Sequence, residues 1–149
     1  MNITPEFVQK VARVFERDVC VRGEVYMSVA TFERIVAEQE NNPNSVLSYV
    51  KGLLALRAAT PALGVEGKWK YVGDMDHPYP MIYARTLGEE KYVVVFNPSK
   101  REVSGSIAPM GKKSEWVYGN NRKLAKCKNS KSGHTFEMKP FSVAIFQIK

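Results

Sequence analysis

The sequence predicts an α+β fold in which N-terminal helices pack on an antiparallel β-sandwich. Before Pro61, apolar residues recur at the three- and four-residue spacing of helices. After about Lys68, short β-branched and aromatic runs are separated by Gly, Pro, Asn and Ser, which is typical of an all-β domain. We therefore expect a helical segment at residues 1–63 and a C-terminal β-sandwich domain at residues 64–149.

The first predicted helix begins at Thr4, which suits an N-cap, with Pro5 at the first helical position. Its apolar face would consist of Phe7, Val8, Val11, Val14 and Phe15. The pattern breaks between residues 18 and 23. Residues 25–39 stay ambiguous, because their first part alternates like a strand and their second part has helical spacing.

A second helix is predicted at about residues 46–59. Asn42-Pro43-Asn44-Ser45 supplies a turn and a cap, and Thr60-Pro61 ends the helix, since proline disfavours helical geometry in the residue before it. Its apolar stripe is broad, so this helix must pack against something large.

Strands are predicted from Lys68 onward, with a hairpin turn at Gly88-Glu89-Glu90. Their expected ranges are 68–72, 81–87, 91–96, 102–107, 115–118, 135–138 and 142–148. With no helices between them, such short strands indicate a small antiparallel sandwich or barrel.

Three stretches, in this order, resemble the C-terminal end of α-amylase-family enzymes (glycoside hydrolase family 13), most of all the oligo-1,6-glucosidase and α-glucosidase branch. They are RIVAEQENNPNSVLSY at 34–49 with LLALR at 53–57 and TPAL at 60–63; DHP at 76–78 with IYAR, LGEEK and VVVFN between 82 and 97; and MKPFSVAIF at 138–146. The resemblance covers residues 34–149. It implies that residues 46–59 correspond to the last helix of a catalytic barrel and that an amylase-type C-terminal β domain follows.

Residues 1–33 do not fit the resemblance, and they are either a divergent remnant or new sequence that covers the apolar face of the 46–59 helix. None of the motifs that surround the family's catalytic acids occurs in the chain. The resembled enzymes keep those acids on barrel strand ends. We therefore expect no catalytic residues and no enzyme activity from this chain alone. The expected role is a non-catalytic structural or docking domain, and a carbohydrate-binding module is the alternative.

Four aromatic residues are candidates for stacking on sugar rings: Trp69, Tyr71, Trp116 and Tyr118. Exposed rings bury a large apolar area against a ligand at low entropy cost. We favour the other interpretation, in which these rings pack within the core or against another domain. Asp74 and Asp76, beside His77, could stand about 7 Å apart on one face of a strand and act as a catalytic pair of carboxylates. Their turn-rich surroundings favour solvated turn carboxylates instead.

The net charge of +7 is uneven, because residues 99–149 hold 11 Lys and Arg against 3 Asp and Glu. Five of these cations fall in ten residues: Arg122, Lys123, Lys126, Lys128 and Lys131. A polyanion site is one interpretation. We favour a solvated loop or an edge strand whose lysines discourage aggregation, and expect no nucleic-acid partner.

Cys20 and Cys127 could pair, but we favour two free thiols. With only His77 and His134 besides, no zinc-type spacing is present. We expect no cofactor and no metal. No apolar run suits a membrane span, and the N-terminus lacks a signal-peptide pattern, so we expect a cytoplasmic location and no membrane partner. The candidate partners are an amylase-type catalytic barrel, a second copy of this chain, and α-glucan oligosaccharides.

Overall fold

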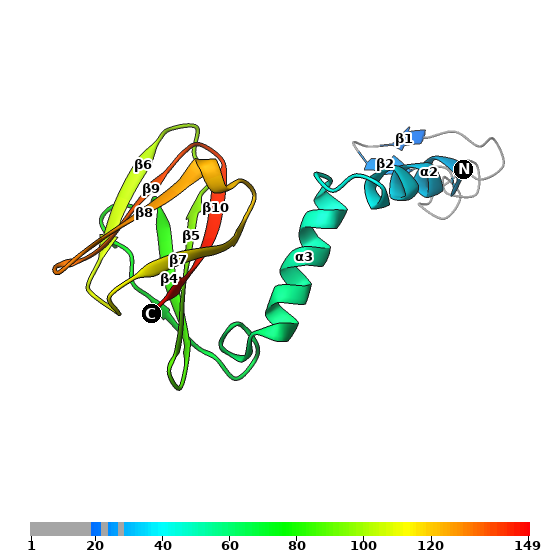
Figure 1. Ribbon diagram of the computed structural model, residues 1–149. Helices are drawn as coiled ribbons and strands as arrows, with labels where there is room; N and C mark the ends of the chain where they lie inside the picture. The colour runs from blue at the N-terminus through cyan, green and yellow to red at the C-terminus, as the bar shows by residue number, and fades with distance from the viewer. Residues whose placement is uncertain (1–18, 22–23, 27–28) are drawn as a thin grey trace. The chain divides into compact units, whose positions relative to one another are not determined.

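A computed structural model describes the backbone of residues 19–21, 24–26 and 29–149, and side chains from Glu33 onward (Figure 1). The helix predicted near residues 4–18 lies outside the described residues. The chain divides into two compact units, Met1–Gly52 and Leu53–Lys149. The sequence-based domain boundary at residue 63 stays a prediction.

In the first unit, β1 (Val19–Val21) and β2 (Glu24–Tyr26) form an antiparallel pair, and α2 (Val29–Glu40) follows. The ambiguous stretch at residues 25–39 therefore contains both a strand and a helix. The next helix, α3 (Val46–Ala59), begins at a cap: the Ser45 hydroxyl accepts a hydrogen bond from the Ser48 backbone amide at 3.1 Å. The predicted cap and the predicted helix at 46–59 are both confirmed.

The second unit begins within α3 and continues through η1 (Pro61–Leu63) into two antiparallel sheets. The five-stranded sheet has the order β3-β4-β5-β10-β7, with β3 at Lys68–Tyr71, β4 at Met81–Leu87, β5 at Glu90–Asn97, β10 at Ser142–Ile148 and β7 at Ser114–Gly119. The three-stranded sheet has the order β6-β9-β8, with β6 at Val103–Ile107, β9 at Gly133–Met138 and β8 at Ala125–Ser130. A short turn of helix, η2 (Arg122–Leu124), precedes β8.

The predicted hairpin between β4 and β5 is present, with Leu87 opposite Glu90 and a two-residue loop between them. Gly88 has a φ of 55°, a left-handed conformation that glycine adopts without steric cost.

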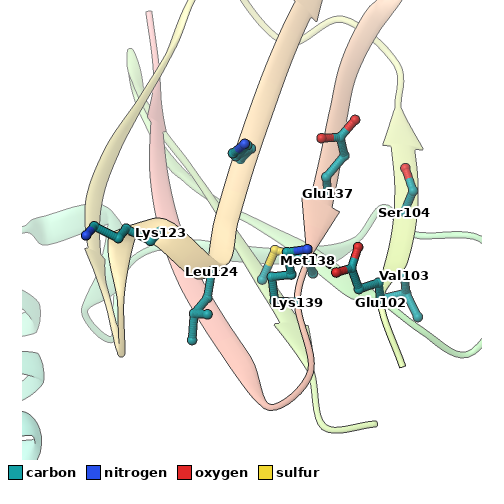
Figure 2. Close-up of a pocket in the computed structure, with 9 residues that line it drawn as sticks. Glu102, Val103, Ser104, Lys123, Leu124, Glu137, Met138 and Lys139 are labelled. Atoms are coloured by element: carbon teal, nitrogen blue, oxygen red, sulfur yellow. Dashed lines mark hydrogen bonds and ion pairs between the residues drawn. The ribbon is translucent and has the colours of Figure 1, made fainter. Parts of the chain in front are cut away.

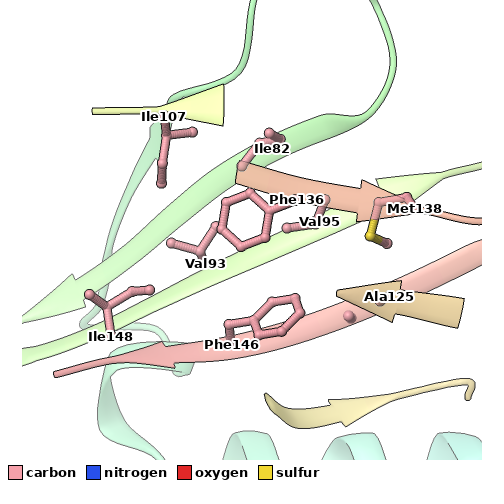
Figure 3. Packing of buried hydrophobic residues seen from close by; sticks show 10 residues of the cluster. Ile82, Val93, Val95, Ile107, Ala125, Phe136, Met138, Phe146 and Ile148 are labelled. Atoms are coloured by element: carbon pink, nitrogen blue, oxygen red, sulfur yellow. The ribbon is translucent and has the colours of Figure 1, made fainter. Parts of the chain in front are cut away.

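The core lies between the two sheets, which makes the unit a β-sandwich as predicted (Figure 3). Its buried side chains are Ile82, Val93, Val95, Ala144, Phe146 and Ile148 from the larger sheet, and Ile107, Ala125, Phe136 and Met138 from the smaller one. The rings of Phe136 and Phe146 meet across it at 5.3 Å between centroids. Because successive side chains of a strand point to opposite faces of the sheet, the larger sheet has a second face that points away from this core.

Candidate functional site

The outer face of the five-stranded sheet, which points away from the core, is only partly covered. Tyr92 and Val94 of β5 and Ile145 of β10 lie on this face and are buried. The residues packed over them come from the end of α3 and from η1: Leu53, Leu56, Ala62 and Leu63. The helix therefore shields one part of the sheet within this unit.

Two side chains of the β4–β5 hairpin hold η1 against the sheet. Glu90 Oε2 accepts a hydrogen bond from the Ala62 amide at 3.1 Å. Arg85 Nε donates to the Ala62 carbonyl at 3.2 Å, and Arg85 Nη2 donates to the Gly64 carbonyl. The backbone at Gly67 passes so close to η1 that an added Cβ would lie 1.9 Å from the Ala62 carbonyl oxygen. These contacts decide which part of the outer face the helix covers.

The remaining part of the outer face presents apolar side chains that are neighbours across three strands. Met81 of β4 lies opposite Phe96 of β5, which in turn lies opposite Val143 of β10. Met81 is 41% exposed and Phe96 is 40% exposed. Cross-strand neighbours on one face form a continuous surface. We call these three residues the open strip.

A groove lies on the same outer face, beside the end of α3. Its volume is about 320 Å³, and it is lined by Leu53, Arg57, Leu63, Trp69, Tyr83, Arg85, Val94 and Ile145. The Trp69 ring lies 6.1 Å from the Tyr83 ring and is tilted 36° to it. Trp69 is 60% exposed, whereas Tyr83 is half-buried, and burial raises the pKa of the Tyr83 phenol. We call this hollow the Trp69 groove.

The four aromatic residues singled out from the sequence do not form one site. Trp69 and Tyr71 lie on β3, and Trp116 and Tyr118 lie on β7, at the opposite edge of the sheet. A bulge in β7 pairs Trp116 with Phe146 and Tyr118 with Ile145, so the two rings are on opposite faces.

Only Trp69 offers a largely open ring among these four. Trp116 packs against the core, and its buried Nε1 has no hydrogen-bond partner among the described residues. Tyr118 packs with the covered part of the outer face, and Tyr71 is half-buried with its hydroxyl donating to the Asp74 carbonyl at 3.2 Å.

Asp74, Asp76 and His77 lie in an exposed turn, as we favoured. Asp74 Oδ1 accepts a hydrogen bond from the Asp76 amide at 2.9 Å, and its Oδ2 lies 2.8 Å from His77 Nδ1. The Asp76 amide and the histidine hold the Asp74 pKa below its usual value, and the carboxylate raises the His77 pKa. The Asp74 carboxylate is thus bonded within its own turn, which fits a structural role.

The basic run of the sequence contains a strand that was not predicted, β8. It is an edge strand of the smaller sheet, and its Lys126 and Lys128 side chains are exposed. Figure 2 shows residues that line a pocket at one end of this sheet, most of them charged or polar. The volume of this pocket is about 260 Å³. The carboxylates of Glu102 and Glu137 are held by ion pairs with Lys139 and Lys128, respectively. The edge-strand interpretation of the run fits this arrangement.

Metal-site geometry is absent from the part of the chain that the structure describes, where no three His, Cys, Asp or Glu side chains gather. Cys127 is a free thiol, and the Cys20 side chain lies outside the described residues. Among the described helices, none has the length and apolar character needed to cross a membrane.

Solved structures share this fold. An α-amylase from H. orenii matches 85% of this chain with 16% identity and a TM-score of 0.59. The isomaltulose synthase from Protaminobacter rubrum matches 76% with 26% identity and a TM-score of 0.62. An isomaltulose synthase mutant from Erwinia rhapontici, in complex with sucrose, matches 74% with 30% identity and a TM-score of 0.58.

The match is confined to a small part of those enzymes. The chain spans 23% of the α-amylase and 19% of each isomaltulose synthase. No protein-family model matches the chain, and no curated protein matches it in sequence.

Proposed function

Because this chain matches the C-terminal region of α-amylase-family glycoside hydrolases, as its sequence motifs predict, we propose that it is a non-catalytic β domain that docks on an amylase-type catalytic barrel. The observation that carries the proposal is the partly covered outer face of the larger sheet. The end of α3 and η1 cover one part of it, and the open strip presents Met81, Phe96 and Val143 beside that part. Contiguous exposed apolar residues mark interaction surfaces.

The proposal assigns no catalysis to this chain. Hydrolysis of a glycosidic bond uses two carboxyl groups on either side of the bond, about 5 to 10 Å apart. The described aspartates, Asp74 and Asp76, share an exposed turn, and Asp74 is bonded to His77. We assign that turn a structural role and place the acids that cleave the bond on the barrel.

The test uses the full chain and the Protaminobacter rubrum isomaltulose synthase from which the region matched by this chain has been removed. Binding is measured by sedimentation velocity, and the melting temperature of the trimmed enzyme is measured with and without the chain. We expect a complex and a higher melting temperature, since a ligand that binds only the folded state stabilises it.

The matched variants are Phe96→Asp, in the open strip, and Met75→Asp, at an apolar residue that is 84% exposed in a loop. Phe96→Asp should weaken binding at least tenfold and Met75→Asp should not. No complex at about 100 μM, or equal loss in both variants, would count against docking through this face; self-association of the chain alone would point to a second copy as the partner.

Carbohydrate binding is the second candidate, and the exposure of Trp69 beside a groove favours it. Isothermal titration with maltooligosaccharides and isomaltooligosaccharides tests it, with product analysis of the same mixtures. Heat of binding that disappears in Trp69→Ala, and not in Trp116→Phe, would support a sugar site. Released glucose would refute the non-catalytic role, and silence in both assays would leave docking as the function.

A further inference from the structure

Arg57 stands between two apolar hollows at the end of α3. On one side is the Trp69 groove, which Arg57 lines together with Leu53. On the other is a shallower hollow of about 460 Å³, to which Arg57, Leu54 and Val65 contribute. Residues 53 and 54 point to different sides of the helix, and residue 57 lies one turn further on, between them. We call the second one the Val65 hollow.

The Arg57 guanidinium carries no hydrogen bond or ion pair among the contacts that the structure describes between residues 33 and 149. The other arginine of the Trp69 groove, Arg85, is already engaged with the carbonyls of Ala62 and Gly64. Among the described residues that line the Trp69 groove there is no acid, and Glu66 is the described acid that lines the Val65 hollow. Among the described contacts, the guanidinium donors of Arg57 are therefore free, at a position between the two hollows.

Apolar side chains surround this charge on both sides. Val65 is 94% exposed, Trp69 is 60% exposed and Leu54 is 57% exposed. A partner that covered both hollows would remove water from Arg57 as well. Desolvating a charge without a counter-ion is costly, whereas a carboxylate matches the planar guanidinium with two parallel hydrogen bonds.

We propose that the docking partner presents a carboxylate to Arg57 and an apolar side chain to each of the two hollows. This inference rests on the proposed docking function and specifies the partner's chemistry: a segment with an acidic residue between two apolar ones, belonging to the catalytic barrel. A second copy of this chain is a poorer fit, because its β domain carries an excess of positive charge, with residues 99–149 holding 11 Lys and Arg against 3 Asp and Glu.

The first experiment probes the site without any barrel. The full chain is titrated with 8-anilinonaphthalene-1-sulfonate, which joins an apolar ring system to an anion, and with Nile red, which is apolar and neutral. We expect Arg57→Met to lower the affinity for the sulfonate dye at least tenfold and to leave Nile red binding unchanged. Lys70→Met is the control, because it removes one positive charge from a neighbouring exposed position of β3.

The second experiment uses the trimmed isomaltulose synthase. Arg57→Met and Arg57→Glu should both weaken the complex at least tenfold, and circular dichroism melts of the isolated chains should stay unchanged because the side chain is exposed. Suppose that the wild-type chain and Lys70→Met bind the trimmed enzyme and that Phe96→Asp does not. If Arg57→Met then binds as tightly as the wild type, docking stands and this inference is wrong. If the wild-type chain does not bind the trimmed enzyme, the proposed function fails. In the dye titration, equal affinity of the sulfonate dye for the wild type and Arg57→Met would overturn this inference separately.

Discussion

Asn97 is a buried polar residue whose replacement should test how the two sheets are joined. It is 0% exposed at the end of β5. Its amide nitrogen donates to the carbonyls of Arg101 at 2.8 Å and Lys139 at 2.9 Å, and also approaches Met138 O at 3.3 Å. Its oxygen accepts from the Ser99 amide at 3.0 Å and from the Ser99 hydroxyl at 2.7 Å.

Asn97→Ala removes these bonds together. Each is worth about 1 kcal/mol net, and a buried carbonyl left without a donor costs a further amount of that order. Because water can replace part of the bonds to Ser99, we expect a total loss of about 3 kcal/mol in the free energy of unfolding. Urea unfolding followed by circular dichroism measures it, as a lower midpoint at an unchanged slope.

Two variants make this test specific. Ser99→Ala keeps the amide donors of Asn97 and should cost less than about 1 kcal/mol. Asn97→Asp places a carboxylate among carbonyl oxygens, which raises its folded-state pKa, so its deficit relative to wild type should grow as pH rises through that pKa. A loss below about 1 kcal/mol for Asn97→Ala would refute the assignment of Asn97 as the tie between the sheets.

Three further predictions concern the η1 contacts and a buried histidine. Arg85→Met should lower stability by about 1–2 kcal/mol in urea unfolding and speed hydrogen exchange at residues 53–64 more than in the sheets, since it frees the carbonyl of Ala62. Gly67→Ala should lower the melting temperature by several degrees, because its Cβ would lie 1.9 Å from the Ala62 oxygen; an unchanged value would contradict the described approach. Burial lowers the pKa of His134, so as pH falls the unfolded chain takes up a proton before the folded chain does. The free energy of unfolding should therefore decrease as pH drops below about 6.5. Urea midpoints measured across this pH range should depend less on pH in His134→Asn.

The elements that the sequence predicts well are those with strong local signals. Ser45 and Pro61 bracket α3, and the bounds of β4 and β10 match the β-branched and aromatic runs from which they were predicted. By contrast, β8 has the sequence AKCKNS, which carries no β-branched or aromatic residue. It is a strand because it pairs with β9, and because Ala125 and Cys127 face the core while its lysines face water.

The candidate site depends on contacts that no local pattern encodes. The bulge that separates Trp116 from Tyr118 arises in the register between β7 and β10, two strands that are separated by 22 residues in the chain. Arg57 was visible in the sequence only as part of a motif. Its position between the two hollows depends on where η1 packs on the sheet. The hydrogen bonds that Arg85 and Glu90 of the β4–β5 hairpin form with Ala62 fix the position of η1.

The character of α3 links this fold to the proposed function. Within the second unit, Leu54 of α3 is 57% exposed, while Leu53 and Leu56 on the neighbouring side of the helix pack on the sheet. A helix that is apolar on more than one side is typical of a protein interior, because a surface helix keeps only one apolar stripe. The sandwich accounts for the Leu53 and Leu56 side alone. A barrel that covered the Leu54 side would bury Val65 and Arg57 in the same step, which is why the proposed carboxylate partner of Arg57 and the proposed docking function make connected but separable predictions.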